Sequence, residues 1–167
     1  MTQVYLSVGS NQQAGLHVPR ALNAIRSEFL PIELSPVYES IAVGFDGDNF
    51  INLVVGFDTE RSLQEIDMIL SQIEKSCGRK RSEERFTSRS MDLDLLIYGD
   101  LVRHDDHWDI PRQEITRNAF VLKPLAELAP EGIHPELGLS FSRLWEEGDF
   151  SNQDLWQVDI LERPFSL

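Results

Sequence analysis

The chain has one cysteine, few basic side chains and no long apolar run. Cys77 is the only cysteine among 167 residues, which excludes an internal disulfide framework and a cysteine-based zinc site. No stretch reaches the roughly 20 apolar residues of a membrane-spanning helix, so we expect no association with a membrane. The N-terminal residues lack a basic region followed by an apolar one, so we expect no signal peptide and a cytoplasmic location.

Basic residues are outnumbered by acidic ones. The 15 Lys and Arg stand against 28 Asp and Glu, which gives a formal net charge of −13. A chain this acidic repels nucleic acid, so we expect no nucleic-acid partner, and any bound anion needs a local basic cluster. Hydrophobic residues make up 41% and charged residues 26%, as in ordinary globular proteins. The length then predicts a single domain over residues 1–167.

Hydrophobic periodicity predicts strands over residues 4–8, 32–40, 51–57 and 91–98. Pro36 within the second of these runs indicates an edge strand or a bulge. Helical spacing predicts helices over residues 18–29 and 62–77. The second helix begins with a capping box of Ser62 and Glu65 and ends at Gly78.

A third helix is expected over residues 114–128, kinked or ended early by Pro124. The segment that follows, with Trp145 and Trp156, matches no clear pattern. The order strand, helix, strand, strand, helix, strand predicts an α+β, ferredoxin-like sandwich with βαββαβ order. Its antiparallel sheet would carry two helices on one face and the third helix on the other.

Asp92 and Asp94 lie two residues apart on an apolar predicted strand. Such residues share a face, about 6.5–7 Å apart, while Leu93 and Leu95 point into the core. Two neighbouring carboxylates repel each other, and a divalent cation relieves that repulsion. Oxygen ligands of this kind suit Mg²⁺. An isolated Asp-x-Asp more often marks only a hydrated strand face.

A basic loop precedes this strand. Residues 79–89 hold five of the fifteen basic residues, four of them Arg, and Arg89 stands three positions before Asp92. The guanidinium fork suits phosphate oxygens, so loop and strand together indicate phosphoryl transfer. A solvated surface loop is the alternative interpretation of the cluster. The chain has no Walker A pattern and no protein-kinase glycine-rich loop, so any use of ATP follows another scheme.

Several motifs, in order from the first strand to about residue 130, resemble the 6-hydroxymethyl-7,8-dihydropterin pyrophosphokinase family. They include Gly9-Ser10-Asn11, Phe50-Ile51-Asn52 and Gly78-Arg79-Lys80-Arg81, and continue with Arg85-Phe86-Thr87-Ser88-Arg89, Asp92-Leu93-Asp94 and Ile110-Pro111. The resemblance implies a ferredoxin-like fold. It also implies transfer of diphosphate from ATP to the hydroxymethyl group of the pterin, with release of AMP, in folate biosynthesis.

The same resemblance assigns roles to particular residues. It implies that Asp92 and Asp94 hold two Mg²⁺ ions, and that Arg79 and Arg89 act on the ATP phosphates as catalytic groups. Further residues are implied at the ATP site: Glu74, Arg81, Arg85 and Arg112. Others are implied to line the pterin pocket: Ser40, Ile41, Val43, Phe50, Asn52 and Phe120. The implied partners are therefore small molecules, ATP and the dihydropterin.

The chain departs from the family pattern around the nucleotide and loop positions. Arg112 stands where the family usually has His, and Asn118 stands near a usual Arg position. Gln113 replaces a residue that is often aromatic or proline, Phe86 stands where Trp is common, and Thr87-Ser88 replaces a Gly-Pro pair. We expect these changes to affect ATP affinity and loop behaviour while leaving the reaction class unchanged.

Two alternative functions share these features. A metal-dependent nuclease or nucleotide phosphohydrolase could use the same aspartates and arginines, although the negative charge disfavours a large nucleic-acid substrate. A non-catalytic pterin- or nucleotide-binding paralogue could keep the fold, although it would have no need of a paired-aspartate metal site.

Overall fold

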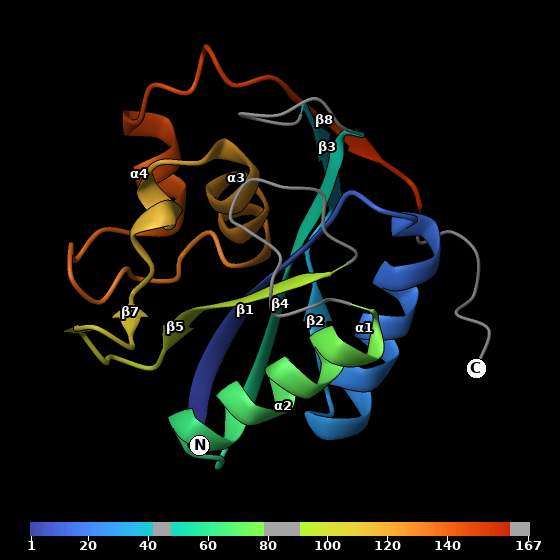
Figure 1. Ribbon diagram of the computed structural model, residues 1–167. Helices are drawn as coiled ribbons and strands as arrows, with labels where there is room; N and C mark the ends of the chain where they lie inside the picture. Colours follow the sequence, from blue (N-terminus) through green and yellow to red (C-terminus); the bar gives the residue numbers. More distant parts are fainter. Residues whose placement is uncertain (42–47, 79–90, 161–167) are drawn as a thin grey trace.

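An antiparallel sheet organises the computed structural model, which describes residues 1–41, 48–78 and 91–160 (Figure 1). Its strands follow the order β5-β1-β4-β3-β8, β2 pairs with β4, and β6 and β7 form a separate two-stranded ribbon. The strands are β1 (Thr2–Ser10), β2 (Glu33–Leu34), β3 (Val37–Ser40), β4 (Phe50–Thr59), β5 (Asp92–Tyr98), β6 (Arg103–His104), β7 (Asp109–Ile110) and β8 (Leu155–Val158). The helices are α1 (Ala14–Glu28), α2 (Leu63–Ser76), α3 (Ala119–Leu128) and α4 (Phe141–Glu147), with a 3₁₀ turn, η1, at Gln113–Thr116.

Helices α1 and α2 cover one face of the sheet (Figure 1). The alternating side chains of Val4, Leu6 and Val8 on β1 are completely buried there. They pack in one cluster with Leu22 of α1 and Ile66 of α2, which lie on the apolar stripes of those helices. The period-two and helical patterns of the sequence meet in this core.

Helices α3 and α4 cover the other face. Val54 of β4 packs here with Leu122 and Leu125 of α3 and Phe141 of α4, and Tyr5 of β1 packs against the same cluster. The predicted α+β class, with an antiparallel sheet and helices on both faces, is therefore confirmed. Among the residues described, no helix is both long and apolar enough to cross a membrane.

The edge strand β5 contains a bulge that sets the orientation of its side chains. Tyr5 pairs with Ile97, but the next residue, Leu6, pairs with Leu95, so Leu96 is an extra residue in β5. On either side of a bulge the alternation of faces is shifted by one. Tyr98 and Leu95 consequently both pack on the α1/α2 core, and Leu96 and Ile97 both pack on the α3/α4 core.

The run over residues 32–40 forms two short strands, not one. Proline cannot donate to a sheet ladder, and Pro36 separates β2 from β3. Ser35, the residue before this proline, is hydrogen-bonded to β4 through both its backbone and its side chain. Its amide donates to the carbonyl of Val54 at 2.9 Å, and its hydroxyl accepts from the Val54 amide at 2.8 Å.

The helix predicted over residues 114–128 is wrong at its start. η1 ends at Thr116, Asn118 has extended backbone angles, and α3 begins at Ala119. Gln153 accepts the otherwise free amide of Ala119 at 2.8 Å, so a distant residue closes this helix end. Pro124 lies within α3 and does not end it.

Helix α2 begins and ends as its sequence predicts. The Ser62 hydroxyl accepts from the Glu65 amide at 3.2 Å, and the same hydroxyl donates to the Glu65 carboxylate at 3.2 Å. Gly78 follows the helix with a φ of 87°, a left-handed conformation that favours glycine. The segment after residue 130, which matched no pattern, forms α4 and the edge strand β8, paired with β3.

Candidate active site

Asp92 and Asp94 lie on the sheet face that α3 covers. Asp92 pairs with Gly9 and Asp94 with Ser7 of β1, whereas the intervening Leu93 is buried in the α1/α2 core. Directly paired residues of neighbouring strands share a face. The two carboxylates therefore lie side by side, off the apolar core, as the spacing predicted.

The charge of Asp92 acts on its neighbour Asp94. The side chain of Asp94 is 24% exposed. Burial, the neighbouring charge of Asp92, and the smaller effects of Glu114 and Glu74 raise the pKa of Asp94 to about 7, against the opposing effect of Arg112. Near neutral pH this site is therefore strongly disposed to accept a cation.

Asn52 extends the same row of the sheet on β4. Gly9 pairs with Asp92 on one side and with Asn52 on the other, so the row crosses from β5 over β1 to β4. A Cβ atom on Gly9 would come within 2.8 Å of the Asn52 Oδ1 atom. The glycine thus leaves the space in which the Asn52 amide lies over β1.

The amide nitrogen of Asn52 is an unsatisfied donor. The residue is only 5% exposed, and its Nδ2 has no hydrogen-bond partner among the described residues. A buried amide without a partner costs free energy, and such atoms are found where a ligand supplies the partner. The structure thus presents a free hydrogen-bond donor on β4, separated from the aspartates of β5 by strand β1.

The other residues expected at a pterin pocket surround Asn52 in part. Ser40 of β3 is buried and pairs with Phe50 of β4, which lies on the same face as Asn52. Phe120 belongs to α3, which covers this face, and packs on its core. Ile41 directly follows β3 and is 57% exposed. Four expected residues, Ser40, Phe50, Asn52 and Phe120, thus lie on one side of the sheet.

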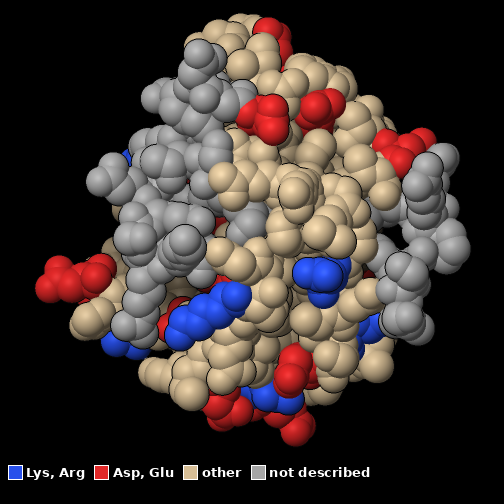
Figure 2. Space-filling model, turned by 45° about the vertical axis from the view of Figure 1, so that its right-hand side comes forward, with Lys and Arg blue, Asp and Glu red and all other residues tan. Residues whose placement is uncertain are grey.

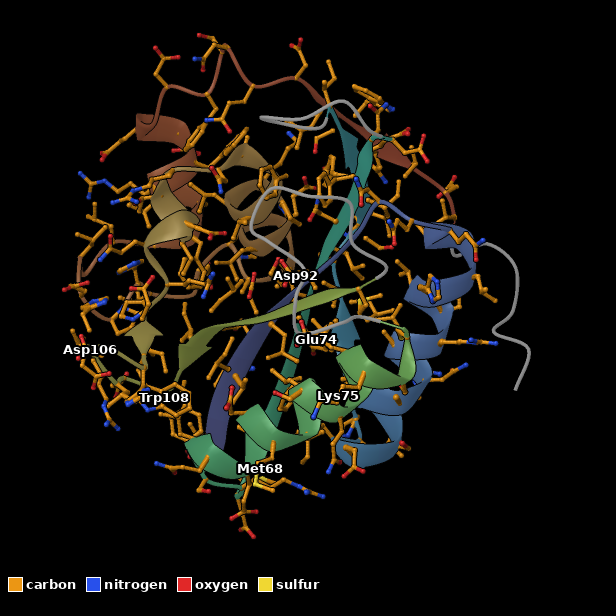
Figure 3. The ribbon with its side chains drawn as sticks, viewed as in Figure 1. Met68, Glu74, Lys75, Asp92, Asp106 and Trp108 are labelled. Atoms are coloured by element: carbon orange, nitrogen blue, oxygen red, sulfur yellow. The ribbon has the colours of Figure 1, made fainter. Side chains whose placement is uncertain are left out.

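Glu74 lies on α2 and bonds to the strand that carries the aspartates. Its carboxylate accepts from the backbone amide of Leu93 at 2.9 Å, between Asp92 and Asp94 in sequence (Figure 3). A backbone group at a sheet edge needs such a partner, and β5 is an edge strand. In this structure Glu74 therefore anchors the strand of the paired aspartates.

Arg112 reaches the site from the segment after β7. Its Nη2 atom lies 3.1 Å from a Glu114 carboxylate oxygen and 3.7 Å from Asp94 Oδ1, and its backbone amide donates to Leu96 of β5. The side chain is 26% exposed, so it is not a freely solvated surface charge. Burial opposes its charge, but Asp94 and Glu114 outweigh burial and raise the pKa of Arg112.

Several expected site residues fall outside the described part of the chain. They are the arginines of the basic loop and one residue of the pocket: Arg79, Arg81, Arg85, Arg89 and Val43. Their placement at the site stays a prediction from the sequence.

The two aspartates fit a magnesium ion better than a metal held by protein alone. Within residues 1–41, 48–78 and 91–160 no three His, Cys, Asp or Glu side chains gather in a way that could hold a metal. Mg²⁺ is commonly held by one or two carboxylates and completes its six ligands with water and substrate phosphates. Asp92 and Asp94 supply the protein share of that set.

A groove that the sequence did not indicate lies beside the site. A cavity of about 510 Å³ opens between α3, α4 and the strands β3 and β8, with Tyr38, Trp145 and Trp156 in its wall. Tyr38 pairs with Asn52, donates to the Glu127 carboxylate, and lies 5.8 Å beneath the Lys123 ammonium. The cavity could not be predicted from the sequence, because α4 and β8, which form part of its wall, matched no sequence pattern.

Charged side chains are distributed unevenly over the surface. Figure 2 shows Lys and Arg in separate patches on one face, with acidic groups at its upper and lower ends and at its left edge. On the part of that face that is described, the basic groups form no continuous band.

Comparison of the chain with known proteins shows which family it resembles. The family model described as 7,8-dihydro-6-hydroxymethylpterin-pyrophosphokinase matches residues 5–130. A 2-amino-4-hydroxy-6-hydroxymethyldihydropteridine pyrophosphokinase of Aquifex aeolicus is 39% identical over 141 residues, which cover 81% of this chain and 85% of that protein. The protein of the same name from Pseudomonas aeruginosa is 34% identical over 135 residues, covering 77% and 82%.

Solved structures agree with the fold. The wild-type HPPK-DHPS of Plasmodium falciparum, solved with SDX-DHP, superimposes with a TM-score of 0.67 at 14% identity. The match covers 87% of this chain but only 43% of that one, so the chain spans less than half of the Plasmodium protein. At this identity the likeness concerns the fold alone.

Proposed function

Since the chain belongs to the 7,8-dihydro-6-hydroxymethylpterin-pyrophosphokinase family, we propose that the face bearing Asp92, Asp94 and Asn52 is its active site. The protein is an ATP-dependent pyrophosphokinase of folate biosynthesis, which transfers diphosphate to the hydroxymethyl group of 6-hydroxymethyl-7,8-dihydropterin and releases AMP. One observation carries the location: the row of the sheet that joins the paired aspartates, across Gly9, to the unsatisfied amide of Asn52.

Asp92 and Asp94 would hold Mg²⁺ in this proposal, as two ions shared with the ATP phosphates. Bound there, the metal would supply positive charge to the phosphate oxygens during transfer. The chain contributes two carboxylates fixed on a sheet strand, with Glu74 anchoring the backbone between them. Rigid positioning of this kind is the main means of catalysis in phosphoryl transfer.

Asn52 would read the edge of the pterin ring. A pterin presents both donors and acceptors, and an amide offers both kinds of group. Phe50 and Phe120 would flank the flat ring, and Ser40, Ile41 and Val43 would line the same pocket. The buried, unpartnered Nδ2 of Asn52 supports this orientation, because a ligand acceptor would satisfy it.

The nucleotide would lie beyond the aspartates, toward Arg112. We assign Arg79 and Arg89 to its phosphates as catalytic groups, with Glu74, Arg81, Arg85 and Arg112 around it. Support comes from the short distance between Arg112 and Asp94 and from the basic composition of residues 79–89. We further propose a cytoplasmic location, because the reaction consumes ATP.

The finer fold assignment also belongs to this proposal. If β2 and β3 are counted as one strand interrupted at Pro36, the elements up to β5 have the βαββαβ order of a ferredoxin-like sandwich. The order β5-β1-β4-β3 and the antiparallel pairing support that assignment.

Product analysis tests the function directly. With ATP, Mg²⁺ and the dihydropterin, we expect AMP and the pterin diphosphate in equal amounts, and neither product when EDTA replaces Mg²⁺. ADP as the nucleotide product would contradict diphosphate transfer. ATP breakdown at the same rate without pterin would identify the phosphohydrolase alternative, and binding of both substrates without turnover would identify a non-catalytic paralogue.

A further inference from the structure

A cation from the protein itself lies within ion-pair distance of Asp94. Arg112 Nη2 lies 3.7 Å from Asp94 Oδ1, within ion-pair distance, and 3.1 Å from Glu114. All three side chains are about three-quarters buried, with exposures of 26%, 24% and 22% for Arg112, Asp94 and Glu114. Water therefore screens this group only in part.

The arginine is held at the site by its backbone but is incompletely bonded. Its amide donates to the Leu96 carbonyl at 2.9 Å, which attaches the residue to β5 itself. Its Nε is buried and has no hydrogen-bond partner among the described residues. A guanidinium has five donors in a rigid fork, so Arg112 has unused capacity for another acceptor close to Asp94.

We propose that, in the metal-free protein, the charge of Arg112 takes the place of the metal ion beside Asp94 and is held there by Glu114. Mg²⁺ must then displace this charge before it binds. This rests on the proposed metal site at Asp92 and Asp94. A cation already beside the carboxylate neutralises part of its charge and repels a second cation. Metal binding without nucleotide is then weaker than the paired aspartates alone would allow.

The nucleotide removes this obstacle. Phosphate oxygens accept from arginine in a forked, charge-assisted geometry, and such bonds are among the strong ones. When ATP arrives, Arg112 gains a new acceptor for its unsatisfied Nε and moves its charge away from Asp94. Metal and nucleotide therefore favour each other's binding, and Arg112 carries part of the coupling between them.

Metal titrations separate this role from a merely structural one. Mn²⁺ is the probe, its binding measured by electron paramagnetic resonance at pH 8.5, with and without a non-hydrolysable ATP analogue. The variants are Arg112→Gln, Glu114→Gln and Asp94→Asn. Arg143→Gln is the matched control, because Arg143 also pairs with a glutamate, at 2.7 Å, but on α4.

We expect Arg112→Gln to bind Mn²⁺ at least about threefold more tightly than wild type without nucleotide, the effect of losing one partly exposed charge. The gain in Mn²⁺ affinity that the nucleotide brings should shrink in the same variant. Glu114→Gln should change affinity in the opposite sense, because Arg112 is then left to Asp94 alone. Arg143→Gln should match wild type.

Two results would overturn the proposal, and they are distinguishable. Equal Mn²⁺ affinity in wild type and Arg112→Gln, with affinity lost in Asp94→Asn, would support the metal site and refute the proposed role of Arg112. Unchanged Mn²⁺ binding in Asp94→Asn would refute the metal site itself, and with it the proposed role of Arg112.

Discussion

At the scale of single residues, the chemistry depends on two acids that the fold forces together. Asp92 and Asp94 cannot separate, because each is paired in register with β1. Burial, together with the neighbouring charge of Asp92, raises the pKa of Asp94 to about 7. The same arrangement that weakens the metal-free protein prepares it for cations, a common feature of functional sites.

Substituting either aspartate should therefore separate activity from stability. Asp92→Asn and Asp94→Asn keep the side-chain volume but remove charge from the metal site, so we expect turnover to fall by about 10²-fold or more. Steady-state AMP formation at several Mg²⁺ concentrations measures this, with circular dichroism to check the fold. Turnover close to wild type at limiting Mg²⁺ would show that the metal lies elsewhere.

Asp94 should make the stability of the metal-free protein depend on pH, and Asp94→Asn should remove that dependence. Because the folded-state pKa is raised to about 7 from an ordinary 3.8, the native protein binds more protons between those values. Stability therefore falls as pH rises from about 4 to about 7. In EDTA, Asp94→Asn should lack this loss and melt above wild type at pH 8.

Asn52→Ala should weaken pterin binding far more than ATP binding. Removing the amide leaves polar atoms of the ring edge without partners, at a cost of about 1–3 kcal/mol in binding free energy. Calorimetry with each ligand in turn measures both affinities. Asn49→Ala is a matched control, because its amide bonds Glu39 at 3.5 Å. Equal losses for the two ligands in Asn52→Ala would place the pterin elsewhere.

At the scale of elements, helix ends and short ribbons are held by single polar contacts. The cap at the start of α2 is one such contact, between Ser62 and Glu65. Ser62→Ala should lower the free energy of unfolding by about 1 kcal/mol, since it frees an amide of the first turn. Denaturant titration measures the change. Ser27→Ala on α1, whose hydroxyl bonds only within its own helix, should cost less.

The β6–β7 ribbon depends on a histidine between two acids. His104 contacts Asp109 through Nδ1 at 2.7 Å and Glu136 through Nε2 at 3.0 Å, which ties the ribbon to the loop before α4. Hydrogen bonds to Glu136 and Asp109 raise the pKa of His104 above its usual value. The protonated side chain thus stabilises the native form.

This contact predicts a pH-dependent stability. The contribution of His104 is complete below about pH 6.5, the unperturbed value, and is lost as pH rises through the higher folded-state pKa. Wild type should therefore exceed His104→Gln in melting temperature by more at pH 6 than at pH 8.5. A melting difference that does not vary with pH would mean that His104 acts only through packing. His107→Gln in the same ribbon is the control.

At the scale of the whole molecule, one sheet separates two cores that must fold together. The α1/α2 core and the α3/α4 core both use side chains of β1 and β4. Leu22→Ala and Leu122→Ala, one in each core, should each lower the free energy of unfolding by about 2–5 kcal/mol. Both variants should unfold in one transition when followed by tryptophan fluorescence and by circular dichroism, because the sheet is shared. Separate transitions would show that the cores are independent.

How far the sequence predicts the molecule depends on the range of the interactions. Local patterns predicted β1, the cap of α2 and the shared face of Asp92 and Asp94, because each depends on neighbours in the chain. The start of α3 was missed because Gln153 closes it from more than thirty residues away. β8 was missed because pairing with β3, not its own pattern, makes it a strand.

The bulge at Leu96 has a consequence for how this protein can change over time. Counted back from Tyr98 by strict alternation, with Leu96 as an ordinary strand residue, Asp92 and Asp94 would turn toward the α1/α2 core and Leu93 toward the site. The bulge takes up Leu96, so both aspartates keep the face that bears the candidate site. Deletion of Leu96 would therefore leave a regular ladder with the aspartates still on that face, whereas deletion of Leu93 would put Asp92 and Asp94 on opposite faces. The position at which a codon is lost from β5 thus decides whether the paired aspartates survive.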